Sequence, residues 1–186
     1  MDTAGYVALL RASGVIACPT ETQMGLLADA RDPIAVQRVC AMKRRPEGEP
    51  LGLLVPSFDA ALELAEDRNG VGERLAARWW PGPLTIVMHA REGIEPALTK
   101  DGKVAVRVPG PSPALEIVRA FGGALTATSA NISGQPPLAR EDELRTAFGD
   151  ALAAIVPGRA PGGLPSTLVD VTGAELRVLR LGPIVV

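Results

Sequence analysis

The chain has 186 residues, of which 47% are apolar, 22% are charged and only 3% are aromatic, and its formal net charge is −2. This length supports one well-buried aliphatic core and is short for two domains. The small negative charge argues against a broad electrostatic footprint for nucleic acid, although a local basic patch would be compatible with it. No apolar run approaches the ~20 residues that cross a bilayer, and the N-terminus lacks the pattern of a signal peptide. We therefore expect a cytoplasmic protein with no membrane partner.

Strand-like and helix-like segments alternate along the chain. Apolar runs predict strands at residues 15–18, 51–55, 84–90, 104–108, 124–128, 153–156, 167–171 and 176–179. Helical spacing, N-cap residues and closing glycines predict helices at residues 33–44, 58–66, 71–79, 113–121 and 141–148. A short turn joins the last two strands, so that pair must be antiparallel. The sequence thus predicts one α/β domain over residues 1–186, with a twisted mixed sheet flanked by helices.

Polar side chains stand at the ends of these elements, where α/β proteins place their ligands. Ser129 and Asn131 fall just past the strand predicted at 124–128. Lys43 and Arg45 lie where a helix must stop before a proline. Two cations, a hydroxyl and a carboxamide can together bind a phosphate or a carboxylate. We therefore expect these four side chains to meet within a few ångströms, although the two pairs are far apart in the sequence.

Further cations are Lys103, Arg107 and Arg180, each of which taken alone is most simply a solvated surface charge. Arg107 is the least ordinary of them, because it interrupts a strand in which valines alternate with other residues. That period of two predicts Arg107 on the face opposite the valines. Hydroxyl-bearing residues, among them Thr22 and Ser166, also recur beside strand ends. These groups extend the candidate anion site beyond the first four residues.

One connecting segment is unusual in composition. Residues 157–165 include three glycines and three prolines. The segment is either a lid over a site or a plain surface connector, and the sequence favours neither.

Several kinds of site are poor candidates. His89 is the only histidine and stands in an apolar run, which argues against a Ser-His-Asp triad and a multi-histidine metal site. Cys18 and Cys40 have no metal-ligand spacing and are expected to be reduced, buried thiols. The glycine patterns of P-loops and dinucleotide-binding folds are absent. A nucleotide would be held by side chains and turn amides, and we expect no metal site built by the protein.

Seven short segments stand out when the chain is read as a whole. They are Pro19-Thr20-Glu21-Thr22-x-x-Gly25-Leu26, Lys43-x-Arg45-Pro46, Trp80-Pro81-Gly82-Pro83-Leu84-Thr85, Val106-Arg107-Val108-Pro109, Thr128-Ser129-Ala130-Asn131-x-Ser133-Gly134, Pro165-Ser166-Thr167 and Arg180-x-Gly182. In this order they resemble the YrdC-like threonylcarbamoyl-AMP synthases, and the resemblance runs from about Val15 to Gly182. Any one segment is a weak signal, whereas seven in order are a strong one. The chain looks like the short, single-domain form with a YrdC-like fold.

The resemblance implies an enzyme that joins L-threonine, bicarbonate and ATP into threonylcarbamoyl-AMP and releases pyrophosphate. The product serves the N6-threonylcarbamoyl modification of tRNA, so tRNA or tRNA-modification proteins are candidate partners. Both chemical steps gather negative charge, and positioning with cationic stabilisation should therefore dominate. Mg²⁺ is expected on the ATP phosphates, mostly coordinated by water.

Carried over position by position, the resemblance implies roles for nine residues. The catalytic group around the phosphates and the carbamate would be Lys43, Arg45, Ser129 and Asn131. ATP would also be met by Arg180 and, with less support, by Lys103. Threonine would be bound by Thr22, Arg107 and Ser166, with Arg107 pairing with its carboxylate.

Two positions depart from the family pattern, and two other functions stay open. Met24 stands where the family commonly has an aromatic residue, and Leu54 where some long-form members have a histidine. The Met24 change bears on amino-acid choice. A paralogue could make a different carbamoyl adenylate, like the related domain of hydrogenase-maturation carbamoyltransferases. Alternatively, the cations could form the basic surface of a structured-RNA or ribosome-associated binding module, with a steep salt dependence.

Overall fold

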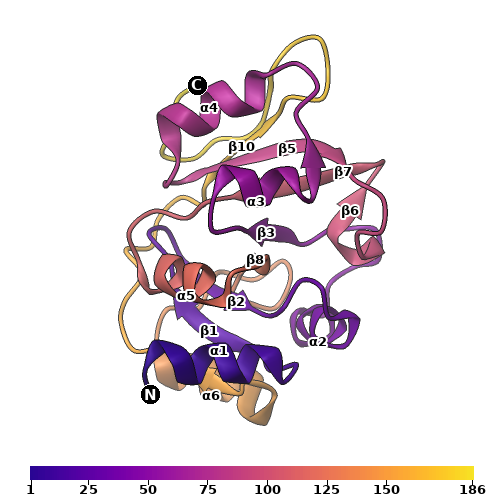
Figure 1. Ribbon diagram of the computed structural model, residues 1–186. Coiled ribbons are helices and arrows are strands. Elements are labelled where there is room, and N and C mark those ends of the chain that lie inside the picture. Colours follow the sequence, from indigo (N-terminus) through magenta and orange to yellow (C-terminus); the bar gives the residue numbers. More distant parts are fainter.

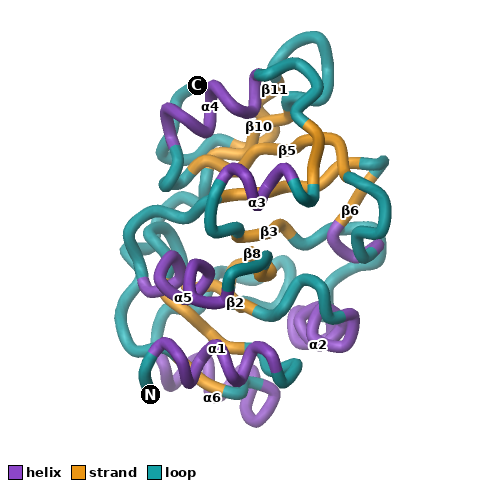
Figure 2. The backbone as a smooth tube through the Cα atoms, viewed as in Figure 1, coloured by secondary structure: helices purple, strands orange, loops and turns teal.

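A computed structural model describes all 186 residues, and its backbone is built around one continuous mixed sheet (Figures 1 and 2). The helices are α1 (Thr3–Arg11), α2 (Pro33–Lys43), α3 (Phe58–Leu62), α4 (Val71–Trp79), α5 (Pro113–Phe121) and α6 (Glu141–Phe148), with 3-10 turns η1 (Pro96–Leu98) and η2 (Gly149–Ala151). The strands are β1 (Ile16–Pro19), β2 (Met24–Leu27), β3 (Gly52–Leu54), β4 (Ala65–Glu66), β5 (Leu84–Ala90), β6 (Thr99–Lys100), β7 (Lys103–Arg107), β8 (Leu125–Ser129), β9 (Ala154–Ile155), β10 (Thr167–Asp170) and β11 (Arg177–Arg180). None of the helices is both long and apolar enough to span a membrane.

The sheet runs in the order β11-β10-β5-β7-β3-β8-β2-β1-β9, with β4 and β6 pairing at the side of β5 and β7. β10 pairs with β5, β3 with β7 and β1 with β9 in parallel, while the remaining pairs are antiparallel. The predicted mixed sheet and its antiparallel terminal hairpin are therefore confirmed. The N-terminus lies beyond the β1 end of this sheet and the C-terminus near its β10 end (Figure 1).

Two helix starts show how local sequence fixes the elements. The carboxylate of Asp32 accepts a hydrogen bond from the Ile34 amide at 2.9 Å, and proline follows it at the first helical position. Ser112 caps α5 in the same way through the Leu115 amide, and Gly122 ends that helix with a left-handed φ of 75°. An N-cap side chain satisfies an amide that would otherwise lack a partner, and proline is preorganised for the first turn. Both starts fall where the sequence predicts them.

The core consists of 41 buried hydrophobic residues that the sheet shares with the helices packed on it. Only Tyr6 and Phe148 in this cluster are aromatic, so the expected aliphatic core is confirmed. Helices α1 and α5 pack against each other and against β1 (Figure 1). The central strands β3, β7 and β8 bring the ends of distant segments together, and the polar residues gather there.

The predicted helix at 58–66 is wrong in its second half. The helix ends at Leu62, and Ala65–Glu66 pairs as a short strand with Ala90 and His89 of β5. Apolar residues 58–66 fit a helical period, but pairing with an open stretch of β5 overrides it. The other predicted boundaries agree with the structure to within one residue, which is inside the usual scatter at element ends.

Three elements are absent from the sequence prediction. They are α1, β2 and β6, which is the short partner of β7. The sequence signal for helix α1 is Asp2, a residue type favoured at the N-cap. In the structure its carboxylate accepts a hydrogen bond from the Gly5 amide at 2.9 Å. β2 contains Gly25, a residue type depleted in strands, and the two-residue β6 is too short to give a periodic pattern. Pairing with neighbouring strands defines both.

Candidate active site

The candidate site is a cavity of about 560 Å³ formed where β2, β3, β5, β7, β8, β10 and β11 meet. Seven of the nine predicted site residues line it: Thr22, Arg45, Lys103, Arg107, Ser129, Ser166 and Arg180. Met24 and Leu54, the two positions that depart from the family pattern, also line it. Lys43 and Asn131 are not among the lining residues and lie behind the wall that Ser129 contributes. The sequence-distant groups therefore do converge on one site.

Lys43 is buried, with 2% of its surface exposed, and its ammonium group is fully hydrogen-bonded. Its Nζ donates to the Ser129 carbonyl at 2.6 Å, to the Asn131 carbonyl at 2.9 Å and to Asn131 Oδ1 at 2.8 Å. The same Oδ1 accepts from the Ser129 hydroxyl at 2.6 Å. Burial, aided by nearby Arg45, lowers the pKa of Lys43 to about 8. An ammonium has three donors, so Lys43 fixes the backbone around Ser129.

Arg45 lies at the mouth of the same cavity, just after α2 ends. Arg44 takes a left-handed conformation, with φ 48°, which stops the helix and turns the chain. The guanidinium of Arg45 then donates from Nε to the Glu49 carbonyl at 2.8 Å and from Nη2 to the Pro50 carbonyl at 2.7 Å. Burial lowers the pKa of Arg45. Two of its five donors thus brace its own loop, and the rest of the fork borders the cavity.

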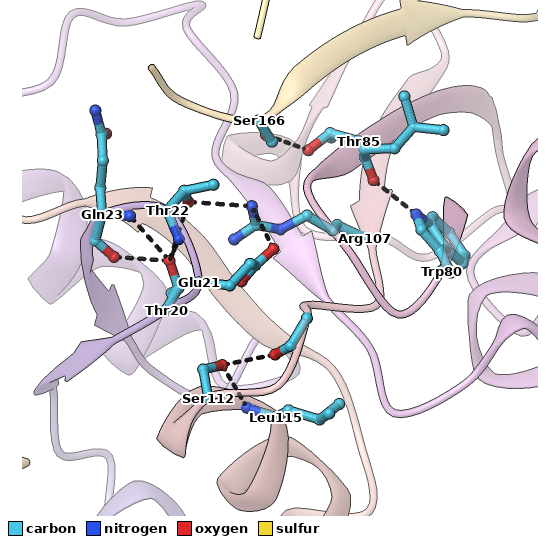
Figure 3. Close-up of polar contacts among 12 residues, drawn as sticks. Thr20, Glu21, Thr22, Gln23, Trp80, Thr85, Arg107, Ser112, Leu115 and Ser166 are labelled. Atoms are coloured by element: carbon cyan, nitrogen blue, oxygen red, sulfur yellow. Dashed lines mark hydrogen bonds and ion pairs between the residues drawn. The ribbon is translucent and has the colours of Figure 1, made fainter. Parts of the chain in front are cut away.

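Arg107 ends β7 on the cavity floor, with 6% of its surface exposed. Val104 and Val106 are buried in the core, and Ala105 and Arg107 line the cavity, which Val104 also borders. The Nη1 group lies 3.4 Å from Thr22 Oγ1 and 3.4 Å from Glu21 Oε1 (Figure 3). Burial lowers the pKa of Arg107, Glu21 opposes that shift, and Arg180 adds to it. Both protein contacts are long, so the other donors are available to a ligand.

The turn between β1 and β2 holds Thr22 in place. The Thr20 hydroxyl donates to the Gln23 carbonyl at 2.7 Å and accepts from the amides of Thr22 and Gln23, each at 3.1 Å. The hydroxyls of Thr20 and Thr22 are 3.0 Å apart. Side-chain hydrogen bonds of this kind replace the missing sheet partners in a tight turn. The turn therefore presents the Thr22 hydroxyl beside Arg107 (Figure 3).

Ser166 and Arg180 meet on the opposite wall. Arg180 donates from Nε and Nη2 to the Ser166 carbonyl at 3.1 and 3.0 Å, and from Nη2 to the Ser166 hydroxyl at 3.1 Å. The Ser166 hydroxyl also lies 2.7 Å from that of Thr85 (Figure 3). Gly182 permits this packing, since a Cβ there would lie 2.3 Å from the Thr167 nitrogen and 2.4 Å from the Pro165 carbonyl.

Lys103 does not stand free in the cavity. Its Nζ donates to Asp170 Oδ2 at 2.8 Å, and Asp170 also accepts from the amide and hydroxyl of Thr172 at 2.9 and 2.6 Å. Burial acts to raise the pKa of Asp170, but these hydrogen bonds outweigh it and bring the pKa to about 2. Asp170 balances the charge of Lys103. Lys103 therefore attracts a ligand phosphate less strongly than an unpaired cation would.

The segment 157–165 touches the site through two hydrogen bonds. The Gly162 amide donates to the Thr22 carbonyl at 2.8 Å, and Gln23 Nε2 donates to the Gly163 carbonyl at 2.9 Å. Pro165 lines the cavity. The segment therefore borders the site, and its movement as a lid stays a prediction.

Metal-binding and thiol chemistry have little support in the rest of the structure. No group of three or more His, Cys, Asp or Glu side chains is placed to hold a metal ion. Cys18 is buried, Cys40 is half-buried, and neither forms a disulfide. The expectation of two buried thiols is thus met fully only by Cys18.

Three polar residues at or beside the cavity were not predicted as site residues, namely Glu21, Thr85 and Asp170. Glu21 and Thr85 stand inside two of the seven motif segments, which was a usable signal. Asp170 carried none, because its partner Lys103 is 67 residues away.

Known proteins are similar to this chain over most of its length. The Sua5/YciO/YrdC family model, described as "Telomere recombination", matches residues 8–182. Proteins named threonylcarbamoyl-AMP synthase are similar to the chain: that of Idiomarina loihiensis is 34% identical over 84% of this chain and 86% of its own, and that of Chromobacterium violaceum is 37% identical over 92% and 88%.

Solved structures give the same result. Sua5 of Pyrococcus abyssi, solved in complex with L-threonine, has a TM-score of 0.89 and 34% identity, covering 96% of this chain and 53% of its own. HypF, in a phosphate- and nucleotide-bound form, has a TM-score of 0.80 at 14% identity, which shows the shared fold alone. The protein belongs to the Sua5/YciO/YrdC family.

Proposed function

We propose that this protein is an L-threonylcarbamoyladenylate synthase, a nucleotidyltransferase that makes threonylcarbamoyl-AMP and pyrophosphate from L-threonine, bicarbonate and ATP. The observation that carries the proposal is the cavity itself, which Arg107, Thr22 and Ser166 line together with Arg45, Ser129 and Arg180. The names of the similar proteins support the same reaction. The product would serve tRNA modification. Because ATP and tRNA are found in the cytoplasm, the protein would act there.

The amino acid would bind at the buried arginine. A carboxylate can take two parallel hydrogen bonds from a guanidinium, and Arg107 has donors without protein partners at the cavity floor. Thr22 and Ser166 would contact the remaining polar groups of threonine. Met24 and Leu54 would give the side-chain end of this pocket an apolar wall.

The reaction then requires two bond-forming steps. Bicarbonate takes up a proton and loses water to give CO2. The neutral amine of threonine attacks the carbon of CO2 and gives a carbamate with release of a proton. A carbamate oxygen next attacks the α-phosphorus of ATP, and the bond to the bridging oxygen breaks to release pyrophosphate. Both steps place anions side by side, so fixed cations and N–H donors lower the barrier most.

The phosphates would lie along the remaining cations. Arg45, Ser129 and Arg180 line that part of the cavity, and Lys103 joins them only as half of a pair with Asp170. Lys43 and Asn131 act from behind the wall by holding the Ser129 segment. Mg²⁺ would arrive with ATP and be held mainly by phosphate oxygens and water, since the protein offers no cluster of carboxylates for it.

The deciding experiment measures pyrophosphate release with ATP and bicarbonate, and identifies threonylcarbamoyl-AMP by mass spectrometry. We expect release to depend on L-threonine, with L-valine and L-serine as matched controls that lack the hydroxyl or the methyl group. Release that depends on carbamoyl phosphate and not on threonine would instead indicate the paralogous reaction. Salt-sensitive tRNA binding with no turnover of ATP would indicate the RNA-binding alternative.

A further inference from the structure

Glu21 is a buried carboxylate that lacks hydrogen bonds. Neither Oε1 nor Oε2 has a hydrogen-bond partner, and 13% of the side chain is exposed. An ionised carboxylate in such a place is costly unless a cation compensates for it. The recorded cation is Arg107, whose Nη1 lies 3.4 Å from Oε1 (Figure 3). Glu21 itself does not line the cavity, so it is placed to act on Arg107 from behind.

Gly110 creates the space that Glu21 occupies. A Cβ at position 110 would lie 2.8 Å from Glu21 Cγ, 3.2 Å from its Cβ and 3.3 Å from its Cδ. The backbone has little freedom to retreat, because the Ser112 hydroxyl donates to the Gly110 carbonyl at 2.8 Å while it also caps α5. The chain that follows Arg107 therefore also shapes the position of its counter-ion.

We infer that Glu21 is a positioning residue, which holds the Arg107 guanidinium so that its free donors face the cavity, and that Gly110 is required for this placement. A long arginine side chain with one weak contact to Thr22 would otherwise sample several rotamers. The buried carboxylate opposes that freedom through charge, and the turn of Thr20 and Thr22 fixes the carboxylate's own backbone. The inference rests on the proposed function, because it assigns Arg107 to the amino-acid carboxylate.

Two variants test the inference through different changes. Glu21→Gln keeps the shape and removes the charge, whereas Gly110→Ala keeps the charge and displaces the carboxylate. Each should raise KM for L-threonine by about tenfold, as loss of a supporting partner commonly does, while KM for ATP changes by less than about twofold. In the double variant the effects should not add, because both act through one carboxylate. Exposed Glu73→Gln and remote Gly123→Ala are the matched controls, expected to behave as wild type.

The outcomes separate this inference from the proposed function. If the wild type and both controls release no pyrophosphate with threonine, the proposed function is wrong. If they are active and the variants keep the wild-type threonine KM, raise both substrate KM values equally, or add in the double variant, the positioning role is wrong. Circular dichroism checks folding. If Glu21→Gln unfolds, Gly110→Ala gives the same comparison, and unfolding of both would overturn the inference in favour of a purely structural pair.

Discussion

Lys43, behind the Ser129 wall of the cavity, and Arg107, on the cavity floor, are two buried cations that differ in how their donors are used. The three donors of Lys43 meet three oxygens at 2.6 to 2.9 Å. Arg107 has five N–H donors, and its two protein contacts are both made by Nη1. They are the Thr22 hydroxyl and the Glu21 carboxylate, each at 3.4 Å. All donors of the Lys43 ammonium are used within the protein, whereas most donors of the Arg107 guanidinium have no protein acceptor.

This difference separates a structural role from a ligand-binding role, whereas the sequence resemblance implies ligand contacts for both Lys43 and Arg107. A saturated ammonium ties α2 to the end of β8 and stabilises the fold around Ser129. An under-coordinated guanidinium in a cavity binds an anion from outside, because bonds to that anion replace contacts the protein leaves unmade. The following predictions test or sharpen this contrast.

The largest effect is expected for Arg107→Ala on substrate binding. Loss of one partner from a buried, hydrogen-bonded charge pair costs about 2–5 kcal/mol. The apparent KM for threonine should therefore rise by roughly one and a half to three and a half decades, with a much smaller change for ATP. Titration of threonine at fixed ATP measures it, and Arg177→Ala on the exposed strand β11 is the matched control. An unchanged threonine KM, or an equal loss of ATP affinity, would show that Arg107 does not hold the amino acid.

Lys43→Met should act chiefly on stability. Methionine fills similar volume but removes all three hydrogen bonds. The Ser129 carbonyl and Asn131 Oδ1 each keep one donor, whereas the Asn131 carbonyl is left unsatisfied, which costs about 1–3 kcal/mol in addition to the lost bonds. We expect the free energy of unfolding to fall by about 3 kcal/mol, measured by urea denaturation. Lys100→Met, at an exposed lysine, should change it by less than about 0.5 kcal/mol. An unchanged urea midpoint for Lys43→Met would mean that the ammonium is not a structural tie.

Asp170→Asn should have an intermediate effect that depends on pH. The folded-state pKa of Asp170 is about 2, below its ordinary value, so the carboxylate stabilises the fold above about pH 4 and loses that contribution as pH falls toward 2. At neutral pH the variant should lose at most about 2 kcal/mol. Near pH 2 it should match the wild type. Unfolding curves across this range measure it, and Asp142→Asn in a surface ion pair is the control; a pH-independent difference would exclude the linkage.

The smallest effect is expected for Arg45→Lys. Lysine keeps the charge but cannot bridge the carbonyls of Glu49 and Pro50 while also facing the cavity. Turnover should fall by about tenfold, which corresponds to about 1.4 kcal/mol of barrier. Steady-state kinetics compare it with Arg44→Lys, at the exposed neighbour. Nearly full activity of Arg45→Lys at saturating substrate would show that the forked geometry of Arg45 has no role in turnover.

Local signals in the sequence predict most of the helices and strands. N-cap side chains followed by proline set the starts of α2 and α5, and glycine set the end of α5. Runs of aliphatic residues set the longer strands, because a half-buried or fully buried strand needs that pattern. The order of the motif segments also indicated the family. These signals are local, so they can be read without knowing what lies across the sheet.

Contacts between segments far apart in the sequence set which polar side chains are structural and which are free to bind a ligand. Lys43 meets Ser129 from 86 residues away, and Lys103 meets Asp170 from 67 residues away. The strand β4 likewise exists only because β5 offers an edge to it. Whether a charged side chain is structural or free to bind a ligand depends on how many of its donors find acceptors. Those acceptors come from segments that only folding brings together, and no local pattern in the sequence records them.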